Sequence, residues 1–125
     1  MKFSLDIPDF ACPIRAYAPG RVTIGEETVT RSVVVLPDRL LPDWPPRRPE
    51  ELTRERLLAL AELEVEVLLI GTGERLRFPD PRALAELTAR GVGVEVMDTP
   101  AACRTFNILA TEGRRVAAAL IIWKG

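Results

Sequence analysis

A glycine turn at residues 71–73 is the first stretch whose residue types could bind a ligand. Gly71, Thr72 and Gly73 follow an apolar, β-branched run, and Arg75 and Arg77 come directly afterwards. Backbone amides in such a turn can hold an anion, and nearby arginines would add positive charge. However, the segment 74–78 alternates as an extended chain does, whereas a dinucleotide fingerprint opens a helix. The turn therefore predicts either a tight structural bend or an anion or small-ligand pocket.

A second group of reactive side chains lies at the start of the helix expected over 99–110. Asp98 is the expected N-cap of this helix, and Cys103 and Arg104 follow within its first two turns. The positive end of a helix and a neighbouring arginine both favour a thiolate. The chain has no histidine that could act as the base. Cys103 is therefore interpreted either as a nucleophile or as a small buried side chain.

Glu95 lies inside an apolar run, where an ionised carboxylate needs a partner. Arg104, Arg114 or Arg115 could provide that partner in a structural ion pair. In the alternative, Glu95, Arg104 and Asn107 form a polar pocket together with the glycine turn. Open α/β sheets usually bind ligands at the carboxyl ends of their parallel strands, and both the turn and the helix cap follow predicted strands.

These patterns define one candidate ligand-binding site and no catalytic residue. No metal ligand set is expected, because histidine is absent and the two cysteines, Cys12 and Cys103, are far apart in the sequence. No cofactor is expected either. The candidate ligand-binding residues are Gly71, Thr72, Gly73, Glu95, Asp98, Cys103, Arg104 and Asn107.

Three apolar strands must position these residues. Their runs cover 64–70, 92–97 and 115–123, and the first two read as buried strands of a sheet covered on both faces. Helical patterns lie between and before them, so the second half of the chain predicts a layered α/β sheet. The direction of the last strand stays open, because the connection that precedes it allows either.

The predicted helices have recognisable ends. Thr53, Asp80 and Asp98 are the expected N-caps, and Pro81 stands at the first position of the second helix. The apolar stripe of that helix is expected to face the core. Glycine ends the second and third helices.

The first half of the chain predicts a smaller β layer. Residues 13–25 read as a hairpin, and 28–36 read as one β-rich strand that Pro37 ends. Residues 40–49 are too rich in proline for regular structure, and Trp44 is expected to pin this loop to the body of the protein. A proline-rich ligand for an aromatic groove is the alternative interpretation of this loop.

Composition limits the possible functions. The chain has 125 residues, 47% of them hydrophobic, and a formal net charge of −1, so one domain over 1–125 is expected. It carries no clustered basic run, so nucleic acid is not an expected partner. No apolar run is long enough to span a membrane, and no secretory signal is recognised. A cytoplasmic location is expected.

Five ordered blocks stand out along the chain, namely LIGTG at 69–73, LRF at 76–78, GVGVEVMDT at 91–99, ACRTFN at 102–107 and EGRRVAAAL at 112–120. Together they resemble the Mth-domain family, which includes bacterial proteins of unsettled activity and a mitochondrial complex I assembly factor. The resemblance implies a three-layer α/β fold with a mixed central sheet, helices and a smaller N-terminal β layer. It does not imply an enzyme.

Two functions follow as hypotheses. The favoured one is a non-enzymatic interaction or assembly protein with an unidentified protein partner or as a homodimer, and it predicts an exposed apolar patch or dimer face. The alternative is a small-molecule or anion-binding protein, or an enzyme, which uses the candidate residues around Gly71 and Asp98. This alternative predicts a deep pocket at the strand ends.

Overall fold

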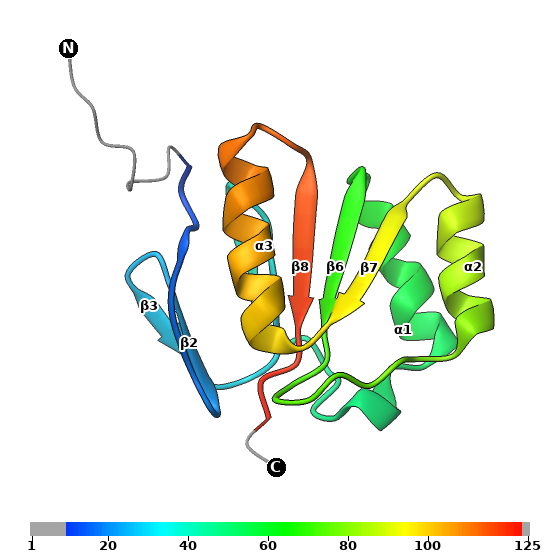
Figure 1. Ribbon diagram of the computed structural model, residues 1–125, viewed down its shortest axis with the longest axis horizontal. Coiled ribbons are helices and arrows are strands. Elements are labelled where there is room, and N and C mark those ends of the chain that lie inside the picture. Colours follow the sequence, from blue (N-terminus) through cyan, green and yellow to red (C-terminus); the bar gives the residue numbers. More distant parts are fainter. Residues whose placement is uncertain (1–9, 124–125) are drawn as a thin grey trace.

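The computed structural model describes residues 10–123, and within this range it forms two sheets and three α-helices (Figure 1). The smaller sheet is an antiparallel meander of β1 (Ile14–Ala18), β2 (Arg21–Ile24) and β3 (Glu27–Val29). Gly20 and Gly25 adopt positive φ angles in the two tight turns that connect these strands. The predicted hairpin and smaller β layer are confirmed.

The larger sheet has the strand order β5-β4-β8-β6-β7. Its central strands are β6 (Val67–Gly71) and β8 (Val116–Leu120), which run parallel to each other, and β7 (Gly93–Met97) is parallel to β6. The three apolar runs thus share one sheet, as predicted. The reversed strand of this mixed sheet is β4 (Val33–Val35), which pairs antiparallel with both β8 and β5 (Leu40–Leu41).

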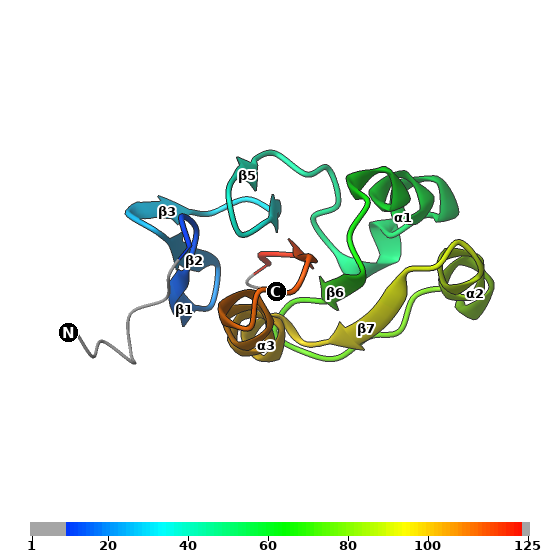
Figure 2. The same ribbon diagram turned by 90° about the horizontal axis from the view of Figure 1, so that it is seen from above.

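Helices cover both faces of the larger sheet (Figure 2). Alternate residues of β6 and β8 point into two separate core clusters, one on each face. One face packs against α3 (Thr99–Thr111) and the meander, and the other packs against α1 (Arg54–Ala59) and α2 (Pro81–Ala89). This is the expected three-layer α/β architecture.

Each helix begins where the sequence predicts. The side chains of Thr53, Asp80 and Asp98 accept backbone N–H groups of the first turn at 2.9–3.3 Å. Short 3-10 helices, Pro49–Glu51 and Leu60–Leu63, flank α1. None of the helices within residues 10–123 has the length and apolar composition that a membrane span requires.

The single strand predicted over 28–36 is wrong. β3 ends at Val29, β4 begins at Val33, and the two strands belong to different sheets. Ser32 lies buried at the break, where its hydroxyl accepts the N–H of Ile122 at 3.2 Å and its carbonyl accepts the N–H of Trp44 at 3.0 Å. Trp44 packs against the second core cluster, so the prediction that it pins the proline-rich loop is confirmed.

The prediction that residues 92–97 form a buried strand is also wrong, because β7 is an edge strand and Glu95 is exposed. Among residues 10–123, no ion pair involves Glu95. Arg114 pairs instead with Glu66, at 2.9 Å from Nε to Oε1. Hydrogen bonds from the Arg114 side chain and the Arg115 backbone N–H lower the pKa of Glu66 below its ordinary value.

Candidate functional site

The glycine turn after β6 is the point where three elements come closest together. A Cβ on Gly71 would lie 3.0 Å from Leu120 Cδ2 and 3.0 Å from the Thr99 Cα, so only glycine fits without displacing the backbone of α3. The Gly71 carbonyl accepts the N–H of Ile121 at 2.9 Å. The turn therefore joins the ends of β6 and β8 to the start of α3.

Thr99 completes this junction from the first turn of α3. Its buried hydroxyl donates to the Ile121 carbonyl at 2.7 Å and accepts the Gly73 N–H at 2.8 Å. The Thr99 N–H donates in turn to the Gly73 carbonyl at 2.8 Å, and the Thr72 N–H donates to the Met97 carbonyl at 2.9 Å. Because the amides of residues 72 and 73 are used inside the protein, the turn has the form of the structural bend.

Thr72 holds the loop that follows the turn. Its buried hydroxyl donates to the Arg75 carbonyl at 2.7 Å and accepts the Arg77 N–H at 3.1 Å. One side chain thus satisfies two backbone groups in a segment without regular structure. As a result, the side chains of residues 74–78 all project from the surface in a defined arrangement.

Three candidate residues on α3 come together in a second place. Cys103, Arg104 and Asn107 line a pocket of about 300 Å³ between α3 and β1, with Tyr17 opposite. Asn107 makes two hydrogen bonds with the backbone of Ile14, accepting its N–H at 2.9 Å and donating to its carbonyl at 2.7 Å. Asn107 thereby attaches the meander to α3 and uses both ends of its amide group.

The candidate residues therefore do not form a single site. Gly71, Gly73 and Asp98 stabilise the junction at the start of α3, and Thr72 holds the following loop. Cys103, Arg104 and Asn107 lie in the groove against the meander, and Glu95 is exposed on the edge strand.

Cys103 lacks the properties of a nucleophile. Its side chain is 4% exposed, and burial raises its pKa to about 12, with Arg104 lowering it and Asp98 raising it by smaller amounts. The positive end of α3 does not offset the loss of hydration. At neutral pH the thiol stays protonated.

This burial predicts that Cys103 reacts slowly with thiol reagents in the folded protein. A maleimide at pH 7.5 should label the half-buried Cys12 first and should reach Cys103 only after urea unfolds the chain. Mass spectrometry of tryptic peptides reports each site separately, and a Cys12→Ser variant isolates Cys103. Fast labelling of Cys103 in that folded variant would contradict the assignment.

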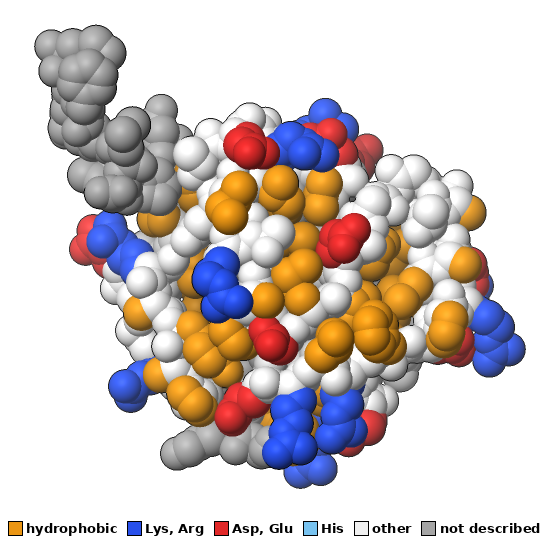
Figure 3. Space-filling model, in the orientation of Figure 1, with side chains coloured by type: hydrophobic (Ala, Val, Ile, Leu, Met, Phe, Trp, Pro, Cys, Tyr) orange, Lys and Arg blue, Asp and Glu red, His pale blue; other side chains and the backbone are white. Residues whose placement is uncertain are grey.

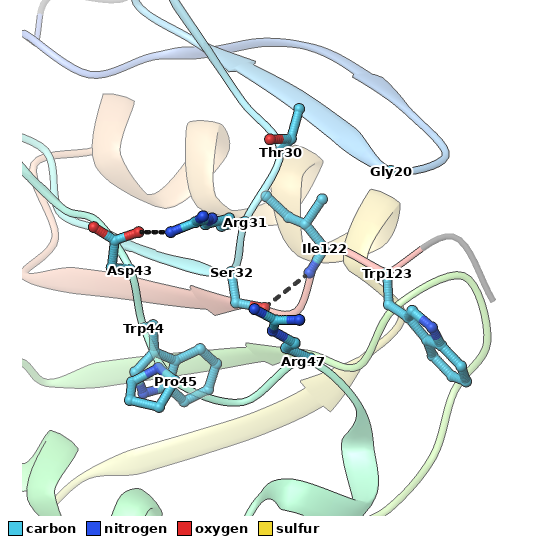
Figure 4. Close-up of a pocket in the computed structure, with 10 residues that line it drawn as sticks. All are labelled: Gly20, Thr30, Arg31, Ser32, Asp43, Trp44, Pro45, Arg47, Ile122 and Trp123. Atoms are coloured by element: carbon cyan, nitrogen blue, oxygen red, sulfur yellow. Dashed lines mark hydrogen bonds and ion pairs between the residues drawn. The ribbon is translucent and has the colours of Figure 1, made fainter.

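Two other pockets lie beyond the carboxyl ends of β6 and β8. The larger, about 580 Å³, is bounded by Trp44 and Arg47 on one side and by Ile122 and Trp123 on the other. In Figure 4, Arg31 points toward Asp43, and Arg47 projects between Trp44 and Trp123. The smaller pocket, about 320 Å³, has Thr72, Arg75, Arg77 and Trp123 in its wall.

Pockets are present at the strand ends, but they contain few of the candidate ligand-binding residues, and ligand binding there stays a prediction. Of the eight candidates, only Thr72 lines either pocket. Trp44, Arg47 and Trp123 were missed as site residues, although they include both tryptophans of the chain and one member of its Arg47-Arg48 pair. Their convergence depends on the proline-rich loop crossing the end of β8, which no local pattern encodes.

Nothing in residues 10–123 has the composition of a metal site, because no group of three or more Cys, Asp or Glu side chains converges there. The strand-end pockets carry four arginines and two carboxylates instead. Figure 3 shows basic side chains gathered at the lower edge of the molecule, below the ends of the parallel strands in Figure 1. This arrangement suits the recognition of an anionic group rather than covalent chemistry.

The chain is similar in sequence to a vertebrate assembly factor. The zebrafish (Danio rerio) NADH dehydrogenase [ubiquinone] 1 alpha subcomplex assembly factor 3 is 42% identical over 110 residues, which are 86% of this chain and 63% of that protein. The chain thus spans less than two thirds of this relative's length.

Solved structures share the fold. A Xanthomonas campestris protein determined by NMR is 38% identical with a TM-score of 0.82, and the match covers 94% of this chain and 89% of that one. A Bordetella pertussis protein described as a Mth938-like domain is 33% identical with a TM-score of 0.82, over 100% of this chain and 94% of that one. The family model described as "Protein of unknown function (DUF498/DUF598)" matches residues 14–121. The chain is therefore a member of this family, the Mth-type domain proteins that the sequence blocks resemble.

Proposed function

We propose that this chain is a non-enzymatic protein-interaction module that takes part in assembling a multisubunit complex. Relatedness to an NADH dehydrogenase assembly factor over most of the chain supports this role. The candidate side chains support it as well, since Thr72, Asp98 and Asn107 are engaged in hydrogen bonds that hold the fold and Cys103 is buried. NADH dehydrogenase subunits are the first partners to test.

The observation that carries the proposal is the exposure of Phe78. This side chain is 71% exposed, and Leu76 on the same loop is 48% exposed. Single exposed apolar residues are ordinary, but two on a short segment whose backbone is fixed by Thr72 form a prearranged contact surface. Aromatic side chains are enriched in protein interfaces, and a rigid loop loses little conformational entropy on binding. We call residues Leu76 and Phe78 the apolar loop surface.

A capture experiment tests this role. The tagged full chain should recover a defined set of proteins from the source cells, and the Leu76→Ser/Phe78→Ser variant should lose most of that set. The matched control is Ile108→Ser, because Ile108 is 59% exposed but lies on α3. Equal recovery by all three proteins would contradict a role for the loop. Light scattering on the purified proteins tests the alternative of a homodimer. If the chain forms a dimer through this loop, the Leu76→Ser/Phe78→Ser variant should have half the molar mass of the original protein.

Other expectations stay proposals. We propose that residues 1–125 form one domain and that the chain acts in the cytoplasm without binding nucleic acid. Its two cysteines are free thiols, as is usual in a reducing compartment. Ligand binding by the residues around Gly71 and Asp98 remains a prediction, and the internal hydrogen bonds of the turn disfavour it.

A further inference from the structure

A basic surface surrounds Trp123 at the carboxyl ends of β6 and β8. Arg47 reaches it from the proline-rich loop, and Arg75 and Arg77 reach it from the loop after β6. Arg48 lies over the Trp123 ring with its guanidinium carbon 5.1 Å from the ring centroid. We call Arg47, Arg48, Arg75, Arg77 and Trp123 the basic strand-end surface.

The charge of this surface is unusual for the chain. The whole sequence is nearly neutral, with 17 basic and 18 acidic residues. Within residues 10–123, Arg31 is paired with Asp43 beside the larger pocket, whereas the guanidinium groups of Arg47, Arg75 and Arg77 take part in no ion pair. Glu74 also lines the smaller pocket, and Glu51 accepts the Arg47 backbone N–H at 2.9 Å but faces Arg56 as its ion-pair partner. The three exposed arginines therefore still outnumber the carboxylates that remain unpaired around Trp123.

The shape of the surface favours an extended ligand. Both pockets are open to solvent, and they share Trp123 as a wall, so they lie next to each other on the surface rather than forming enclosed cavities. Small molecules are usually bound in sites that bury most of their surface. An extended peptide could place one carboxylate at Arg47 and another at Arg75 or Arg77, and lay an apolar side chain against Trp123.

From this charge and shape we infer that the basic strand-end surface binds an acidic, extended segment of a partner protein. The inference rests on the proposed function, because the ligand is taken to belong to a protein partner. It adds a second contact region that does not include the apolar loop surface. Arg75 and Arg77 line the pocket, whereas Leu76 and Phe78 do not belong to its wall.

Fluorescence anisotropy with defined probes tests the inference. The probe is a short fluorescein-labelled peptide of Glu and Gly with one central Leu, and its matched control carries Gln in place of Glu. The acidic peptide should bind more tightly than the Gln peptide, and its affinity should fall as salt rises from about 0.05 to 0.5 M because the charges are exposed. The Arg47→Gln/Arg75→Gln/Arg77→Gln variant should weaken binding by about tenfold or more, which is the effect of losing about 1.4 kcal/mol.

The control variant is Arg90→Gln, which removes an exposed arginine at the far end of α2 and should bind the acidic peptide as the original chain does. A circular dichroism melt checks that the triple variant is folded. Equal affinity for the acidic and Gln peptides, or equal loss in the Arg90 variant, would overturn the inference. So would tighter binding of a fluorescein-labelled single-stranded oligonucleotide through the same three arginines, since that result would assign the surface to nucleic acid.

The Leu76→Ser/Phe78→Ser variant separates this inference from the proposed function. It should bind the acidic peptide with unchanged affinity, because neither residue lines the pocket. If the acidic peptide fails to bind while protein capture still depends on the apolar loop surface, this inference fails and the proposed function stands. If capture does not depend on that loop but the peptide binds through the arginines, the apolar loop surface is wrong and the basic surface stands.

Discussion

Replacing Phe106 with alanine should lower the free energy of unfolding by about 3–5 kcal/mol, the range for removing a buried aromatic ring from a packed core. Phe106 is fully buried on α3, in the cluster that joins α3 to the larger sheet and the meander. Its ring also makes an edge contact with Phe10, with centroids 6.0 Å apart and planes at 79°. Ala118 of β8, in the same cluster, is too small to fill the space that the ring leaves.

Urea denaturation followed by circular dichroism measures this loss. With an m value of about 1.5–2 kcal/mol/M, the unfolding midpoint should fall by about 2 M. The matched control is Ile108→Ala, two residues away on the exposed side of the same helix, which should change the free energy by about 0.5 kcal/mol or less. A Phe106→Ala loss near that of the control would mean that α3 does not anchor the three layers.

The stability of the whole chain depends on how closely its layers approach. Three consecutive alanines at 117–119 occupy the middle of β8, the central strand of the larger sheet. They place only small side chains on both faces, so that helices can pack closely against the sheet. Phe106 supplies the volume on one face, and Leu57 and Leu87 from α1 and α2 supply it on the other.

The helices and parallel strands could be predicted because their signals are local. Asp80 with Pro81 and Asp98 with Pro100 mark helix starts without reference to the rest of the chain. The parts of these runs that form β6 and β8 are apolar throughout, as central strands are. The ends of the strands were predicted less accurately. A strand over 64–70 was predicted, but β6 begins only at Val67. Glu64 adopts a left-handed conformation at the end of the preceding 3-10 helix, so the extended chain cannot begin there.

The errors arise where tertiary structure overrides a local preference. Residues 28–36 have continuous β propensity, but Ser32 receives hydrogen bonds from two distant segments and the chain crosses between sheets there. Glu95 suggested a buried ion pair because the position of β7 in the sheet was unknown; at the edge, its carboxylate remains hydrated and needs no partner.

The residues that line the strand-end pockets were also hard to predict, because they are brought together by tertiary structure. Motif reasoning favoured the residues with the most suggestive chemistry, and the structure uses many of them to hold the junction at the start of α3. The pocket residues that were missed, Arg47 and Trp123, are 76 positions apart in the sequence and meet only because a loop crosses the end of β8. A hydrogen-bonded turn and an anion-binding turn have the same sequence signature, since glycine serves both.

Thr99→Val should test this structural role of the glycine turn, and we expect it to lower the free energy of unfolding by about 2–4 kcal/mol. Valine keeps the shape of threonine but removes the hydroxyl, which leaves the Gly73 N–H and the Ile121 carbonyl without their partner. Each unsatisfied buried group costs about 1–3 kcal/mol. Urea denaturation measures the change, and Thr99→Ser, which retains the hydroxyl, should lose much less.

Thr111→Val is the matched control, because Thr111 is exposed at the other end of the same helix and the substitution should leave stability within about 0.5 kcal/mol. Hydrogen exchange adds a local measurement: the Gly73 amide should lose protection in Thr99→Val before the centre of β6 does. If instead Thr99→Val matched Thr111→Val in stability and in exchange at Gly73, the amides of the turn would not need the threonine. The turn would then be available to bind an anion, and the ligand-binding alternative would regain support over a purely structural bend.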